Sequence, residues 1–200
     1  MHIAKPGLRA LGVAESYSGR EYSTLAGVVM RKDLRIDGVG FARVTVGGMD
    51  ATDAVIRLYS RLGRRDINFL MIGGNVIAWY NIIDPAAVHE ATGLPVIIVT
   101  YEESEGLEED IRRHFPGDDA RLAAYRNLGG RMPVRLRSGC TLFIRSCGIA
   151  EEDAARLCNG FTYEGRVPEP IRVARLIARG VVRSSGSPGL ALTTMTVEVA

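Results

Sequence analysis

The chain has little lysine, few cysteines and no long apolar run, and each shortage excludes a class of protein. Lysine occurs only at Lys5 and Lys32, so arginine supplies every other basic side chain. The three cysteines, Cys140, Cys147 and Cys158, show no CxxC spacing, which argues against a structural zinc site and for free thiols in a reducing compartment. No stretch approaches the roughly 20 apolar residues that cross a bilayer, and no signal peptide is recognisable. We therefore expect a cytoplasmic protein that does not enter a membrane.

The composition is that of an ordinary globular domain. Of the 200 residues, 46% are hydrophobic and 24% are charged, and the formal net charge is +2. A chain of this size is expected to enclose one core, and its net charge is too small to identify a nucleic-acid binder. We expect a single domain over residues 1–184, followed by a C-terminal tail over residues 185–200.

The order of apolar patterns predicts an α/β fold with a mixed sheet. Apolar runs separated by turn signals predict three successive strands at 8–13, 23–30 and 41–46, connected as an antiparallel meander. Helices and strands then alternate, which favours parallel pairing and helices on both faces of the sheet. Strands are predicted at 67–72, 96–99, 134–136 and 141–146, and helices at 51–62, 84–93, 102–115, 118–128, 150–158 and 168–183.

This order of elements is that of a ribonuclease H-like sheet, and short motifs make the resemblance more specific. The segment GVAESY at 12–17 resembles the first-strand signature of endonuclease V. Further motifs resemble the DUF99 or UPF0215 group of largely archaeal proteins with an endonuclease V-like fold: VGGMDAT at 46–52, IGG at 72–74, YNIID at 80–84, GLPVI at 93–97 and PEPIRVA at 168–174. The resemblance implies an endonuclease V-like domain and a nuclease ancestry.

The resemblance also implies site residues that this chain lacks. The family pattern has an Asp at the positions of Ala14, Gly47 and Gly73, and typically a histidine at that of Arg175. Metal-dependent cleavage of a phosphodiester needs carboxylates that converge on Mg²⁺ or Mn²⁺. Methyl groups and hydrogens provide no ligand, so the sequence favours a catalytically degenerate protein with neither a metal nor another cofactor.

Four acids remain near these positions: Glu15, Asp50, Asp53 and Asp84. Glu15 follows Ala14 on a strand, so its side chain should point to the opposite face and cannot simply replace the missing acid. Asp50 and Asp84 each precede a predicted helix and are interpreted as N-caps. An active Mg²⁺- or Mn²⁺-dependent nuclease with ligands relocated to Glu15, Asp50 or Asp84 is the alternative.

Basic and aromatic residues indicate a nucleic-acid site. Four arginines fall within a narrow stripe of the last predicted helix: Arg172, Arg175, Arg179 and Arg183. Arg166 and Arg156 could extend this patch, and guanidinium groups match the oxygens of DNA or RNA phosphates. Solvated surface, or ion pairs with the acidic run at 102–110, is the alternative. Trp79 and Tyr80 could stack on a base or pack in the core.

From Leu190 to Val199 the tail has the Thr and Val alternation of a strand and could pair with a sheet edge. The edge could belong to its own subunit or to another, and pairing with another would give a homodimer. Three functions are therefore considered: a non-catalytic nucleic-acid binder, which the substitutions favour, an active nuclease, and a scaffold protein that binds no nucleic acid.

Overall fold

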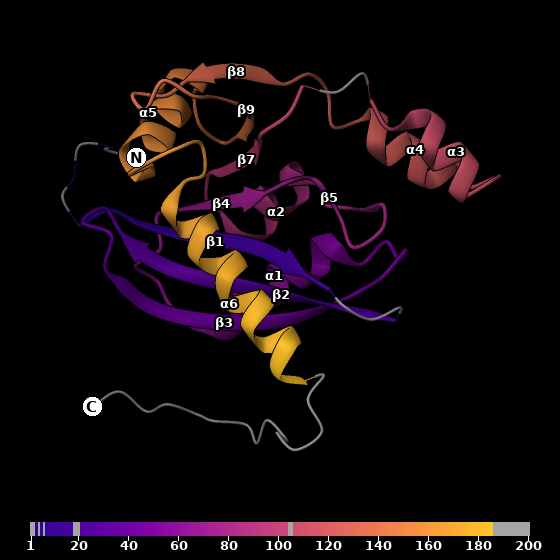
Figure 1. The fold of residues 1–200 in the computed structure, drawn as a ribbon, viewed down its shortest axis with the longest axis horizontal. Coiled ribbons are helices and arrows are strands. Elements are labelled where there is room, and N and C mark those ends of the chain that lie inside the picture. Colours follow the sequence, from indigo (N-terminus) through magenta and orange to yellow (C-terminus); the bar gives the residue numbers. More distant parts are fainter. Residues whose placement is uncertain (1–2, 4, 6, 18–20, 104–105, 186–200) are drawn as a thin grey trace.

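A seven-stranded sheet forms the centre of the computed structural model, which describes residues 3, 5, 7–17, 21–103 and 106–185 (Figure 1). The strand order is β3-β2-β1-β4-β7-β9-β8. These strands are β1 (Arg9–Ser16), β2 (Tyr22–Arg31), β3 (Ile36–Thr45), β4 (Phe69–Gly73), β7 (Val96–Thr100), β8 (Met132–Arg135) and β9 (Thr141–Cys147). A separate small hairpin consists of β5 (Val76–Ile77) and β6 (Asn81–Ile82). The helices are α1 (Ala51–Leu62), α2 (Pro85–Thr92), α3 (Glu108–His114), α4 (Asp119–Arg126), α5 (Glu151–Phe161) and α6 (Glu169–Ser185).

The topology confirms the predicted mixed sheet. Strands β1, β2 and β3 pair antiparallel, whereas β4 pairs parallel with both β1 and β7. The last two strands differ from the parallel arrangement predicted for the second half, because β9 is antiparallel to both β7 and β8. A tight turn at residues 136–140 joins β8 to β9, with the Leu136 N–H donating to the Cys140 carbonyl at 2.9 Å. A connection this short joins only antiparallel strands.

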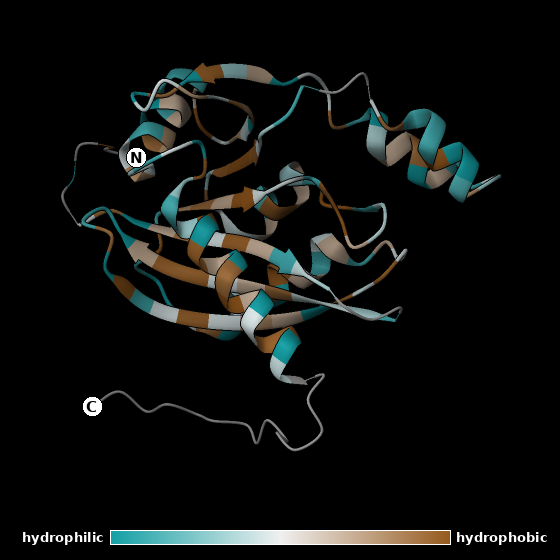
Figure 2. Ribbon diagram, viewed as in Figure 1, coloured by the Kyte–Doolittle hydropathy of each residue, from teal (hydrophilic) through white to brown (hydrophobic). Residues whose placement is uncertain are grey.

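Helices cover both faces of the sheet, as predicted. Helices α1 and α2 pack on one face around Leu11, Val55 and Val88, and α5 and α6 pack on the other around Val28 and Phe161. Figure 2 shows the apolar residues concentrated along the central strands. Alternate strand residues therefore serve two separate halves of the core.

Helix α6 lies directly against the first strand. A Cβ atom added to Gly12 of β1 would lie 2.3 Å from the carbonyl carbon of Pro170, which is closer than any side chain allows. Glycine at this position therefore lets the first turn of α6 touch the backbone of β1. The contact fixes the place of α6 across β1 and β2 (Figure 1).

Helix ends follow the sequence signals. The Asp84 carboxylate accepts hydrogen bonds from the N–H groups of Ala86 and Ala87 at 2.8 and 3.3 Å, which confirms it as the N-cap of α2. Gly63 ends α1 with a φ of +61°, a conformation that glycine adopts without strain.

Helices α3 and α4 form a hairpin that projects from one end of the molecule (Figure 1). We refer to residues 107–127 as the arm. No described helix is long and apolar enough to cross a membrane. The predicted tail lies outside the described residues, apart from Ser185 at the end of α6.

Candidate functional site

Two adjoining cavities lie where the parallel strands end, and we call them together the cleft. Val13 of β1 pairs with Ile72 of β4, so Ala14 and Gly73 follow side by side at the carboxyl ends of these strands. The first cavity has a volume of about 440 Å³, and its lining includes Ala14, Glu15, Gly73, Trp79, Tyr80 and Arg175. The second has a volume of about 420 Å³ and shares Gly73 and Arg175 with the first. The cleft thus occupies the sheet edge at which α/β proteins bind their ligands.

The side chain of Arg175 extends from α6 to the end of β4. A Cβ atom added to Gly73 would lie 3.7 Å from Nη2 of Arg175 and 2.9 Å from Cγ2 of Ile171. The Arg175 guanidinium carbon also lies 5.5 Å from the ring centre of Tyr101. Burial raises the pKa of Tyr101 to about 12, and Arg175 partly counters that rise. A positive charge therefore stands beside Gly73 at the end of β4.

The residues of the cleft do not suit a divalent cation. Ala14 and Gly73 have no side-chain donor atom, and the guanidinium of Arg175 would repel a metal ion. Within the described part of the chain, no three His, Cys, Asp or Glu side chains come together to hold a metal. Glu15 lines the first cavity and Glu102 the second; Oε1 of Glu15 accepts a hydrogen bond from the Ala78 N–H at 3.2 Å, and Glu102 pairs with Arg166.

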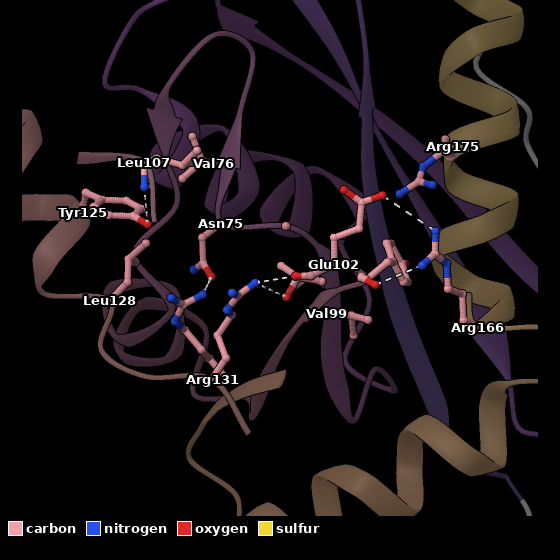
Figure 3. A pocket seen from close by; sticks show the side chains of 15 residues that line it. Asn75, Val76, Val99, Glu102, Leu107, Tyr125, Leu128, Arg131, Arg166 and Arg175 are labelled. Atoms are coloured by element: carbon pink, nitrogen blue, oxygen red, sulfur yellow. Dashed lines mark hydrogen bonds and ion pairs between the residues drawn. The ribbon is translucent and has the colours of Figure 1, made fainter. Parts of the chain in front are cut away.

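Three further arginines line the second cavity: Arg131, Arg145 and Arg166. Figure 3 labels Arg131 and Arg166. Arg145 donates to Oδ1 of Asn75 at 2.9 Å, and burial, followed by the nearby charge of Arg131, lowers the pKa of its guanidinium. Arg166 donates to the Tyr101 carbonyl at 3.0 Å and lies 3.8 Å from a carboxylate oxygen of Glu102. The cavity combines this positive charge with apolar walls, which suits an anionic ligand that also carries an apolar part.

The predicted arginine patch is divided in the structure. Arg175 and Arg166 meet in the cleft, whereas Arg172 is exposed and its Nε donates to Oε2 of Glu169 at 2.9 Å. Arg179 and Arg183 lie on the exposed side of α6, and Arg156 pairs with Asp153 on α5 at 3.2 Å. Helical periodicity predicts the direction of each side chain but not its partner. The predicted patch therefore included arginines that do not line the cleft. Arg131 and Arg145, which the sequence analysis missed, gave no periodic signal.

Trp79 stands at the rim of the cleft on a strained turn. Ala78, Trp79 and Tyr80 have φ values of +41°, +60° and +60°. This left-handed conformation costs roughly 1–2 kcal/mol for each residue that has a Cβ atom. Trp79 is 47% exposed, and its ring lies edge-on to His114 with 4.9 Å between ring centres. The indole is therefore presented to solvent, while Tyr80 packs against His114 and Phe115 of the arm.

Arg121 of the arm holds this turn in place. Its side chain is 4% exposed and donates hydrogen bonds to the carbonyls of Gly47, Gly48 and Tyr80 at 2.8, 2.9 and 2.6 Å. The Gly47 N–H in turn donates to the Ala78 carbonyl at 2.8 Å. Gly47 has a φ of +70° and packs against Trp79. Unlike Ala14 and Gly73, it does not line the first cavity of the cleft.

The predicted role of Asp50 as a side-chain cap is wrong. Asp50 precedes α1, but its carboxylate accepts hydrogen bonds from Thr45 and Asn81, and Oδ1 of Asn81 accepts the Ala51 N–H at 2.9 Å. Burial alone would raise the pKa of Asp50, but the hydrogen bonds from Asn81 and Thr45 outweigh it and lower that pKa. Asp50 therefore ties the end of β3 to β6, and Oδ1 of Asp84 caps α2. Neither carboxylate lines the cleft described above.

Comparisons with known proteins agree with this fold. The UPF0215 protein of Pyrobaculum calidifontis is 40% identical over 173 residues, which cover 86% of this chain and 95% of the relative. The UPF0215 protein TK2033 of Thermococcus kodakarensis is 32% identical, with coverage of 89% and 94%.

Solved structures show the same architecture. A protein of unknown function from Archaeoglobus fulgidus superposes with a TM-score of 0.76 at 24% identity, covering 88% of this chain and 98% of that one. Human ENDOV superposes with a TM-score of 0.66 at 21% identity, covering 92% and 90%. The family model described as Endonuclease dU matches residues 6–182. The chain thus has an endonuclease V-like fold and belongs to the Endonuclease dU family.

Proposed function

We propose that this protein binds nucleic acid in the cleft without cleaving it. Arg175 and Arg166 would contact phosphate oxygens, and Trp79 would stack on an unpaired base at the rim. The observation that carries the proposal is the guanidinium of Arg175 beside Gly73 and Ala14, because it puts a cation where metal-dependent cleavage needs carboxylates. Arginine forks bind phosphate oxygens in pairs, and an exposed indole stacks on any base.

The family name gives the competing proposal. Endonuclease dU denotes a nuclease, and an Endonuclease V from Ciona intestinalis was solved with DNA that contains an inosine. In this chain Glu15 and Glu102 are the carboxylates that line the cleft, and Glu102 pairs with Arg166, so cleavage would require a metal held chiefly by groups from the substrate and water. A scaffold protein with no affinity for nucleic acid is the third candidate.

The test measures binding and cleavage in the same samples. Labelled single-stranded and duplex oligonucleotides are titrated across salt concentrations in Mn²⁺ by fluorescence anisotropy, and the recovered strands are sized. Trp79 is the single tryptophan of the chain, so quenching of its emission reports directly on occupation of the rim. We expect salt-sensitive binding with intact strands and a quenched indole.

Two matched variants assign the binding to the cleft. Arg175→Gln removes the charge inside the cleft, and Arg183→Gln removes the same charge from the exposed side of the same helix. We expect Arg175→Gln to weaken binding about tenfold and to lower the salt slope by about one, with a smaller change for Arg183→Gln. Cleaved oligonucleotides would show instead that the protein is a nuclease. If no oligonucleotide binds, the scaffold function is the remaining candidate.

A further inference from the structure

Strand β3 is the outermost strand of the sheet and has one unpaired edge. It pairs with β2 on one side, and no described segment pairs with its other side. An edge strand of ten residues is a template for pairing with another chain unless charges, prolines or a covering element protect it. This inference is independent of the function proposed for the cleft.

The hydrogen bonds at the end of β3 show which of its residues face outward. The Val46 N–H donates to the Glu21 carbonyl at 2.9 Å, so Val46 faces β2, whereas the Thr45 N–H faces away and donates to Asp50. Alternate residues of a strand direct their N–H and C=O groups to opposite edges. Val39, Phe41 and Arg43 therefore present their backbone groups to the open edge.

Side chains close this edge at both ends of that stretch. Nη1 of Arg64 donates to the Asp37 carbonyl at 2.6 Å, and the Thr45 carbonyl accepts from Nδ2 of Asn81 at 2.9 Å. The open part of the edge is thus limited to residues 39–43. Phe41 is its midpoint.

The same three residues leave apolar surface uncovered. Phe41 pairs with Ala26 and Val39 with Val28, so their side chains lie on the face that α6 covers over β1 and β2. Val39 and Phe41 lie outside the area that α6 covers and are 41% and 43% exposed. Neither lysine nor proline occurs in β3, and Arg43 is the one charged side chain in the open part of the edge.

We propose that the open edge of β3 pairs with β3 of a second copy of this chain. The paired strands would run antiparallel about a two-fold axis at Phe41. Phe41 would then face Phe41 of the second copy, and Val39 would face Arg43. In this register the three outward residues exchange all their N–H and C=O groups, the pairs stop where Arg64 and Asn81 close the edge, and the aromatic rings cover each other.

The arrangement makes a joint sheet with two separated clefts. The axis is perpendicular to the sheet, so α6 of both copies lies on the same face. Since the paired strands are antiparallel, the carboxyl ends of β1 and β4 in the two copies point in opposite directions. The two clefts would therefore open toward opposite ends of the joint sheet.

Single cysteines test the register on the full chain under mild oxidation. In a hydrogen-bonded antiparallel pair the Cα atoms are about 5.5 Å apart, which a disulfide spans. We expect Phe41→Cys to give a covalent dimer by itself. Val39→Cys and Arg43→Cys should each stay uncrosslinked alone and crosslink when the two proteins are mixed. The unsubstituted chain, with its own three cysteines, measures the background.

Sedimentation provides a second readout that needs no oxidation. The unsubstituted chain should reach twice its mass of 21.7 kDa as its concentration rises, and Phe41→Lys should shift that equilibrium at least tenfold toward monomer. Leu176→Lys, at a residue of α6 that is 53% exposed, is the matched control and should leave the equilibrium unchanged. A monomer at every concentration, a dimer that Phe41→Lys does not weaken, or a dimer without the Phe41→Cys crosslink would each overturn the proposal.

Discussion

Replacing Arg121 by methionine should destabilise the protein and release the turn that carries Trp79. The methionine has similar length but no charge or donor. The side chain is 4% exposed, its Nε donates to Oδ2 of Asp118 at 2.9 Å, and its guanidinium carbon lies 3.9 Å from the ring centre of Phe115. The substitution leaves Asp118 without its cation and three loop carbonyls without their donor.

The expected loss is large for one side chain. Hydrogen bonds from a charged donor contribute about 1.5–3 kcal/mol each, but bonds that share one guanidinium are not additive. Part of the loss is recovered because water can reach the loop carbonyls once the arm loosens. We therefore expect a decrease of about 3–5 kcal/mol in the free energy of unfolding, which lowers the Tm of a domain of this size by about 10 °C.

The assay combines urea unfolding followed by circular dichroism with the emission of Trp79. Arg126→Met is the matched control, because Arg126 lies on the same helix, is half exposed and pairs with the partly exposed Glu108. It should change stability by less than about 0.5 kcal/mol. If Arg121→Met unfolds at the same urea concentration as Arg126→Met with unchanged emission, the buried guanidinium does not hold the turn.

Three further changes have defined outcomes. Asp84→Ala removes the cap of α2 and should cost about 1 kcal/mol in urea unfolding, whereas Asp84→Asn should cost less, and equal losses would contradict capping by an acceptor oxygen. Folding lowers the pKa of Asp50. Its contribution to the free energy of unfolding is therefore complete above the pKa of the unfolded chain and is lost as the pH falls through the pKa of the folded protein. Asp50→Asn should accordingly flatten the acid limb of a plot of stability against pH. Gly73→Asp brings a Cβ atom within 2.9 Å of Ile171 and should lower Tm without restoring cleavage in Mn²⁺, and a cleaved strand would show that the cleft accepts a metal.

Most of the fold could be predicted because local signals and burial agree. Asp84 before Pro85 marks the start of α2, and Gly63 marks the end of α1, since each residue suits the backbone conformation it adopts. The hairpin β5–β6 was not predicted, because Ala78, Trp79 and Tyr80 adopt a left-handed conformation that no sequence rule assigns to them. Tertiary contacts from Glu15 and Arg121 impose that conformation.

The family resemblance singled out Ala14 and Gly73, and the parallel pairing of β1 with β4 brings them side by side. The position of Arg175 in the cleft depends on how α6 crosses the sheet, and the burial of Arg121 depends on how the arm folds back on residues 47–48. Arginines are abundant in this sequence, so neither could be distinguished from exposed arginines before the structure.

The contact between Gly12 and Pro170 has a consequence for biosynthesis. Strand β1 lies in the interior of the sheet, and α6 covers one face of β1 and β2, so this face stays bare until residues 169–185 have left the ribosome. Contacts between such distant segments slow folding, since a long loop must close before they form. We expect nascent chains that stop short of α6 to be trapped by chaperones that recognise exposed apolar strands, and completed chains to escape them.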